Sequence, residues 1–145
     1  MKYPFRASHG LIEVRASIVG PHGSQMVTLA VDTGASSTLL DRTLLEKLGY
    51  SLGSSEQTTF TTGSRKETAS RVSVETIEAL GRTAVRLSVI AYTLPPSTFL
   101  DGVLGLDFFR ETRLVLDFRA GKLWLELGPP GKPTPARSSA PGSTT

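Results

Sequence analysis

Hydrophobic and polar residues alternate along much of this chain, which is the pattern of β-strands that bury one face. Residues 12–18 carry aliphatic or small side chains at every second position, and residues 27–31 do the same. Turn residues at 20–23 separate the two runs, which together predict a β-hairpin. The same period of two returns in four later segments, at 72–74, 85–89, 114–118 and 123–127. Six or more short strands are therefore expected.

Two segments break this period and predict short helices. Asp41 is a suitable N-cap for a helix that contains Leu44 and Leu48, and Gly49 follows as a stop signal. A second helix is predicted to start near Asp107 and to include the next three residues. The expected fold class is thus all-β with one or two short helices.

The segment from Thr58 to Val74 predicts another hairpin, because β-branched residues flank a polar stretch around residues 63–66. By itself this pattern describes either a solvated surface hairpin or a mobile cover over an active site. The choice between the two interpretations depends on the chemistry of the rest of the chain.

A single folded domain accounts for the 145 residues, which are too few for two domains of ordinary size. We expect this domain to span residues 1–127. From residue 128 onward the sequence is dominated by Pro, Gly, Ser and Thr and carries few charges. Residues 128–145 are therefore predicted to form a flexible C-terminal tail.

Composition narrows the range of partners. The net charge is +3, but Lys and Arg are scattered along the chain, so we expect no nucleic-acid partner. Cysteine is absent and the two histidines lack metal-ligand spacing, so neither a metal site nor a cofactor is predicted. Residues 1–20 alternate like a strand instead of forming an apolar signal sequence, and no apolar run is long enough to cross a membrane. We expect a cytoplasmic protein with no membrane partner.

The candidate chemistry begins with the triplet Asp32-Thr33-Gly34, which ends the apolar run 27–31. Alternation along this strand places Asp32 on the face opposite the large aliphatic residues. A strand that delivers a carboxylate into a turn of small residues is a candidate active site, although a lone triplet of this kind is often only a turn. The chain holds one Asp-Thr-Gly and no Asp-Ser-Gly. If the chemistry needs two such acids, the second must come from another copy of the chain.

A second block, Val103-Leu104-Gly105 with Leu106-Asp107 behind it, follows about seventy residues later. Alone, such a block is only a buried strand that ends in a turn. In the order strand, Asp-Thr-Gly-Ala, helix, hairpin, strand and this block, the chain resembles the retropepsin-like aspartic proteases, the single-domain relatives of retroviral protease with cellular and bacterial members. The resemblance covers residues 10–127.

This resemblance implies a closed, mostly antiparallel β-barrel of the acid-protease type that works as a symmetric homodimer on peptide or protein substrates. Each subunit would give one Asp32 to a catalytic pair, which makes the protein an aspartic endopeptidase without a cofactor. Two carboxylates at such close range cannot both ionise, so they share a proton. One of them accepts a proton from the attacking water while the other donates one to the peptide oxygen.

The resemblance also implies roles for residues around Asp32. Thr33 would hydrogen-bond across the dimer axis, and Gly34 would present its amide to the catalytic carboxylate. The residues that would support the active-site loop are Thr33, Gly34, Ala35, Val103, Leu104 and Gly105.

The hairpin at residues 59–70 would be the flap that closes over a bound substrate and excludes water. Its substrate-binding residues, at the tip, are Thr61, Thr62, Gly63 and Ser64. This tip lacks the glycine-rich sequence of viral members.

Two positions depart from the retroviral pattern. Retroviral members usually carry an acid where this chain has Ser36 and an arginine where it has Leu106, and that pair braces the active-site loop. Asp107 fits the Leu-Asp sequence of cellular and bacterial relatives. Aspartates outside the triplet are expected to act as helix caps and turn formers, namely Asp41, Asp101, Asp107 and Asp117.

Because of these departures, a second class of function stays open. It is a module of the same fold that dimerises or binds peptides in its groove without efficient cleavage. A weaker third possibility is an accessory role in nucleic-acid binding for the basic surface.

Overall fold

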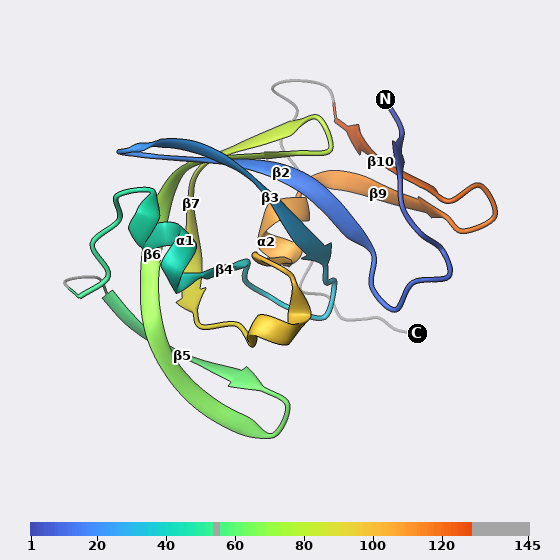
Figure 1. The fold of residues 1–145 in the computed structure, drawn as a ribbon. Helices are drawn as coiled ribbons and strands as arrows, with labels where there is room; N and C mark the ends of the chain where they lie inside the picture. The colour runs from blue at the N-terminus through green and yellow to red at the C-terminus, as the bar shows by residue number, and fades with distance from the viewer. Residues whose placement is uncertain (54–55, 129–145) are drawn as a thin grey trace, which may run out of the picture.

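The computed structural model describes residues 1–53 and 56–128, and strands dominate this part of the chain (Figure 1). The strands are β1 (Tyr3–Pro4), β2 (Glu13–Gly20), β3 (Gly23–Val31), β4 (Leu39–Asp41), β5 (Glu56–Thr62), β6 (Arg65–Ala79), β7 (Arg82–Tyr92), β8 (Gly102–Leu104), β9 (Thr112–Asp117) and β10 (Lys122–Leu127). The helical segments are α1 (Arg42–Lys47), η1 (Pro96–Thr98) and α2 (Leu106–Phe109). The predicted all-β class is confirmed. Apart from Gly128, the predicted tail lies outside the described residues.

Six strands close into a barrel. Their order is β2-β3-β8-β4-β7-β6, and pairing between β2 and β6 closes the ring, with β5 attached outside it to β6. The expected closed barrel is confirmed and is mostly antiparallel, with parallel pairing only between β3 and β8 and between β4 and β7 among its described strands. Parallel neighbours need long connections, and here each connection runs through several other elements.

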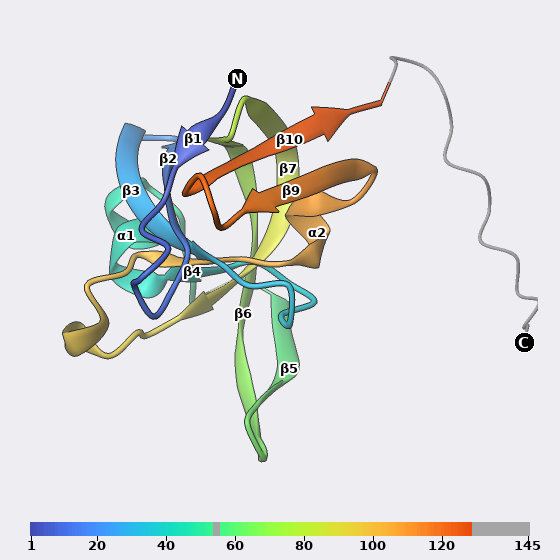
Figure 2. The same ribbon diagram turned by 90° about the vertical axis from the view of Figure 1, so that its right-hand side faces the viewer.

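A second sheet has the order β1-β10-β9 and is antiparallel throughout. Figure 2 shows this sheet at one end of the molecule and the β5–β6 hairpin at the other. Trp124 in β10 is half-buried, and the Nζ atom of Lys2 lies 4.3 Å from the centroid of its ring. The N-terminal segment therefore contacts Trp124 through the Lys2 side chain.

The predicted helices form where the caps and stop signals place them. Asp41 caps α1 by accepting hydrogen bonds from the amides of Thr43 and Leu44, and Gly49 beyond the helix has a φ of +97°. Both helices direct leucine or phenylalanine side chains into the barrel, and Phe108 of α2 is fully buried. No helix in the described ranges has the length and apolarity to cross a membrane.

Tyr50, just after α1, ties two barrel strands together. Its hydroxyl donates to the carbonyl of Val19 in β2 at 2.9 Å and accepts from the amide of Glu75 in β6 at 2.8 Å. Burial of the phenol raises the pKa of Tyr50 above its usual value of 10.0. The neutral hydroxyl thus supports the barrel at the place where β6 closes onto β2.

Raising the pH above 10 should weaken the fold through Tyr50. Because its pKa is higher in the folded than in the unfolded chain, its contribution is complete below the unfolded pKa and is lost as pH rises through the folded one. The chain has three tyrosines, so phenolate absorbance of the wild type and of Tyr50→Phe resolves its titration. A Tyr50 that ionises no later than tyrosine in the urea-unfolded chain would contradict this assignment.

Candidate active site

Asp32 begins a tight loop directly after β3. Its amide donates to the carbonyl of Leu104 at 2.9 Å, and its own carbonyl accepts from the amide of Ala35 at 3.1 Å. The Gly34 amide donates to Oδ1 of the Asp32 carboxylate at 2.9 Å. The backbone and one carboxylate oxygen of Asp32 are therefore held by hydrogen bonds within the chain.

The loop rests on β8 and the residue after it. Val31 and Leu104 are paired in the parallel β3–β8 register, and Leu104 is fully buried. Gly105 follows at a close approach: a Cβ atom there would lie 2.7 Å from the carbonyl carbon and oxygen of Ser37. Only glycine fits this gap without moving the loop. The next amide, from Leu106, donates to the carbonyl of Ala35 at 2.8 Å.

Thr38 lies at the end of the Asp32 loop, in the interior of the protein. It is fully buried, and its amide donates to both carboxylate oxygens of Asp107 at 3.0 Å. Its hydroxyl donates to Oδ1 of Asp107 at 2.7 Å and accepts from the Gly105 amide at 3.1 Å. Hydrogen bonds to a carboxylate are stronger than neutral ones, so Asp107 anchors the end of the loop to α2.

The triplet itself is open to solvent. Asp32, Thr33 and Gly34 are all classed as exposed in the single chain, whereas the residues beneath them are buried. The chain thus presents the Asp32 carboxylate at its surface on a buried base, and among the described residues no second Asp-Thr-Gly loop lies over it.

The β5–β6 hairpin projects away from the barrel (Figure 2). Its strands pair from Glu56 opposite Arg71 to Thr62 opposite Arg65, leaving Gly63 and Ser64 as a two-residue turn. Gly63 has a φ of +60°, the left-handed conformation that such turns require. The predicted tip residues Thr61, Thr62, Gly63 and Ser64 do lie together at this end of the hairpin.

Tyr92 holds the hairpin against the barrel. Its ring packs edge-on against that of Phe60 at a centroid distance of 5.4 Å, and its hydroxyl donates to Oε2 of Glu67 at 3.1 Å. Phe60 and Glu67 are cross-strand partners, so Tyr92 contacts both strands of the hairpin. The hydrogen bond to Glu67 is the main cause that raises the pKa of Tyr92.

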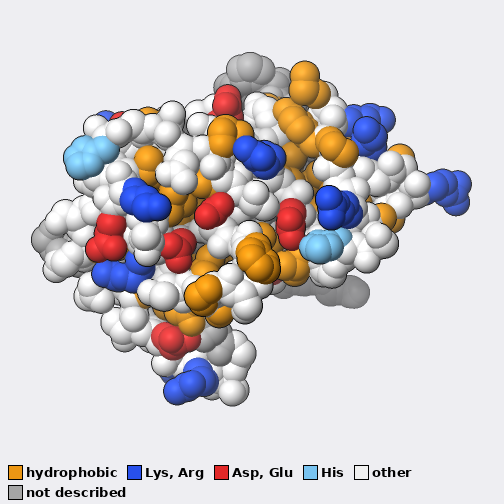
Figure 3. Space-filling model, in the orientation of Figure 1, with side chains coloured by type: hydrophobic (Ala, Val, Ile, Leu, Met, Phe, Trp, Pro, Cys, Tyr) orange, Lys and Arg blue, Asp and Glu red, His pale blue; other side chains and the backbone are white. Residues whose placement is uncertain are grey.

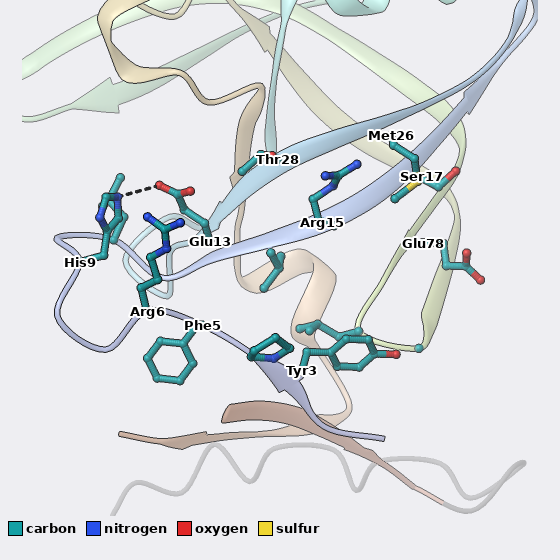
Figure 4. Close-up of a pocket in the computed structure, with 15 residues that line it drawn as sticks. Tyr3, Phe5, Arg6, His9, Glu13, Arg15, Ser17, Met26, Thr28 and Glu78 are labelled. Carbon is teal, nitrogen blue, oxygen red and sulfur yellow. Dashed lines mark ion pairs between the residues drawn. The ribbon is translucent and has the colours of Figure 1, made fainter. Parts of the chain in front are cut away.

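A pocket of about 850 Å³ lies elsewhere (Figure 4). The N-terminal segment, including Tyr3 and Phe5, forms one side of it, and outward-facing residues of β2 and β3 form another. At its edge, His9 and Glu13 form an ion pair of 3.2 Å. None of the lining residues belongs to the Asp32 loop or to its support, so this pocket is not the candidate site.

Surface charge and metal ligands add little to the site. On the face shown in Figure 3, basic side chains lie apart from one another and among acidic ones. Within residues 1–53 and 56–128, no group of three or more His, Asp or Glu side chains is arranged to hold a metal ion. Within residues 32–38, Asp32 is the one ionisable side chain.

The structure brings together the Asp32 triplet, Ala35 and the Val103-Leu104-Gly105 block, which are distant in sequence. The expectation for the other aspartates is confirmed for Asp41 and for Asp117, which accepts from the Ala120 amide in a turn. It is wrong for two others.

Asp101 and Asp107 do not act as local caps or turn formers. Each accepts a hydrogen bond from a residue that is distant in sequence. Asp101 accepts from the amide of Thr28, which lies 73 residues earlier, and Asp107 accepts from Thr38, 69 residues earlier. The Leu-Asp sequence after Gly105 was the one signal that could have found Asp107. No local pattern marks Thr38, because its contact with Asp107 depends on the closed barrel.

Comparisons with known proteins agree with this geometry. The sequence profile of the family described as "Aspartyl protease" matches residues 14–108. Among solved structures, a retropepsin-like aspartic protease from Rickettsia conorii is similar, with a TM-score of 0.64 and 17% identity over 87% of this chain and 89% of that one. The retroviral protease-like domain of Ddi1 from Leishmania major aligns with a TM-score of 0.52 and 14% identity, over 86% and 98% of the two chains. At these identities the likeness is one of fold. A comparison with curated proteins finds no match.

Asp107 should be important for stability. Replacing it by alanine leaves the buried amide and hydroxyl of Thr38 without their acceptor, at a cost of about 2–4 kcal/mol in the free energy of unfolding. Urea unfolding of Asp107→Ala measures this loss. Asp117→Ala, which removes one exposed turn bond, is the matched control and should cost less than about 1 kcal/mol. Equal losses in the two variants would contradict the anchoring role of Asp107.

Proposed function

Because the chain belongs to the aspartyl protease family, we propose that it is an endopeptidase that acts as a homodimer with one Asp32 from each subunit. One observation carries this proposal. Asp32 stands exposed on a loop that is held by hydrogen bonds on both sides, and the chain contains only one such loop. An acid that is fixed in place yet open on one side is suited to meet its counterpart from a second copy.

The proposed reaction is hydrolysis of a peptide bond by an activated water. In the dimer, the two Asp32 carboxylates share one proton, because their charges at close range repel each other. The ionised carboxylate takes a proton from the water as it attacks, and the protonated one donates to the peptide oxygen. The Gly34 amide already donates to Asp32 Oδ1 and so fixes the orientation of the carboxylate.

Thr33 is proposed to join the two loops across the dimer axis, where its exposure leaves it free to reach a partner. The β5–β6 hairpin is proposed to act as a flap over an extended peptide, with Thr61, Thr62, Gly63 and Ser64 nearest the substrate. Support for this comes from its position beside the loop, to which Arg71 of β6 connects through Ser37. The cytoplasmic location that composition favours also stays a prediction.

The alternative is a module of the same fold that dimerises or binds peptides without efficient cleavage. It is favoured by one feature, the presence of Ser36 and Leu106 where retroviral members carry a charged bracing pair. The two functions differ in a single measurable property, turnover that depends on Asp32.

Cleavage of a denatured protein or of a peptide library should depend on Asp32. We expect Asp32→Asn to lower kcat by about a thousandfold or more, because the dyad then lacks an ionisable carboxylate, while circular dichroism shows an intact fold. Asp117→Asn, a change at a surface turn, should leave the rate unaltered. Wild-type protein that cuts nothing from acid to neutral pH, yet dimerises, would establish the binding module instead.

Specific activity should fall on dilution. A site shared by two subunits disappears when the protein concentration drops below the dimer dissociation constant. Activity and sedimentation measured over the same dilution series should therefore change together. Full specific activity in a species of monomeric mass would rule out a shared site.

A further inference from the structure

Arg71 links the hairpin to the loop that carries Asp32. It lies in β6, opposite Glu56 at the end of the hairpin and opposite Ile90 of β7. Its Nη2 donates to Oγ of Ser37 at 3.1 Å. Its Nη1 donates to the carbonyl of Ser88 at 3.1 Å and to Oγ of the same residue at 3.2 Å. The Arg71 guanidinium thus donates to β7 through Nη1 and to the Asp32 loop through Nη2.

Ser37 is held between two supports. On one side its backbone lies against Gly105, where a Cβ atom would come within 2.7 Å of it. On the other side its hydroxyl accepts the bond from Arg71. Ser37 also precedes Thr38, which is fixed by Asp107, and follows Gly34 by only three residues. A displacement of Ser37 is therefore transmitted along a short, restrained segment to Asp32.

The same face of β6 contacts the barrel along the hairpin. Glu67 and Arg71 are four residues apart in the strand, so their side chains lie on one face of it. Glu67 accepts from Tyr92, and Arg71 donates to Ser37 and Ser88. The hairpin is therefore attached to β7 near its middle, and at its base to both β7 and the Asp32 loop.

We propose that Arg71 is a positioning residue of the active site, which fixes the Asp32 loop through Ser37 and makes its position depend on that of the hairpin. This proposal rests on the proposed proteolytic function, because it assigns Arg71 to the same site. The guanidinium is well suited to the task, since its fixed fork bonds two partners at once, whereas a lysine would reach only one of them well.

The test compares Arg71→Met, Arg71→Lys, Ser37→Ala and the Arg71→Met/Ser37→Ala double variant in the full-length protein. With a peptide that the wild type cleaves, Arg71→Met should lower kcat by about threefold to tenfold and change KM by less than about twofold. Arg71→Lys should recover only part of the loss. The double variant should be no slower than Arg71→Met, because both changes remove the same bond.

Hydrogen exchange gives a readout that does not need catalysis. In Arg71→Met, amides of the loop at residues 35–38 should exchange about tenfold faster, while those of β2 and β3 keep their rates. Arg15→Met is the matched control, since this exposed arginine lies on β2 and lines the pocket outside the Asp32 site. It should change neither kcat nor loop exchange.

Unchanged loop exchange in Arg71→Met, or losses in kcat that multiply in the double variant, would overturn the positioning role. Faster exchange throughout the barrel would also overturn it, because that result shows a general loss of stability. If the wild type cleaves no peptide, the proteolytic function fails by itself, and exchange alone decides whether Arg71 fixes the loop.

Discussion

The structure depends on the need to satisfy the polar groups of one buried residue, Thr38. A threonine with no solvent contact must find partners for its amide, carbonyl and hydroxyl within the protein, since each unpaired group would cost stability. Asp107 accepts from its amide and hydroxyl, the Gly105 amide donates to its hydroxyl, and the Ile90 amide donates to its carbonyl. These bonds fix β7, β8 and α2 around the segment that carries Asp32. The position of the acid is therefore set from inside the barrel.

Much of the fold was predictable from local signals in the sequence. Alternation located the β2–β3 hairpin and the later strands, and Asp41 with Gly49 marked both ends of α1. The parallel pairings were not predictable, because β4 and β8 have three residues each and their neighbours are decided by barrel closure. The same limit applies to the site. The triplet and the Val-Leu-Gly block are visible as motifs, but the contacts of Arg71 and Asp107 are made between residues far apart in the chain.

The loop around Asp32 is braced differently from the retroviral pattern. Ser36 and Leu106 cannot form an ion pair, and the structure instead places a carboxylate on one side of the loop and a guanidinium on the other. Asp107 acts on Thr38 from α2, and Arg71 acts on Ser37 from β6. Charged groups are thus present, but each bonds a neutral partner. Because each partner is neutral, only one charged group in each bond has to lose its hydration.

The long separation between Thr38 and Asp107 has a consequence for synthesis of the chain. The Asp32 loop is synthesised before the residues that support it, because its floor at Leu104 and its anchor at Asp107 are made 69 or more residues later. Contacts of such long range form late in folding, because the intervening chain must be ordered first. A nascent chain that ends before residue 104 has the acid without its support. The Asp32 loop is thus completed only when nearly the whole barrel has been made.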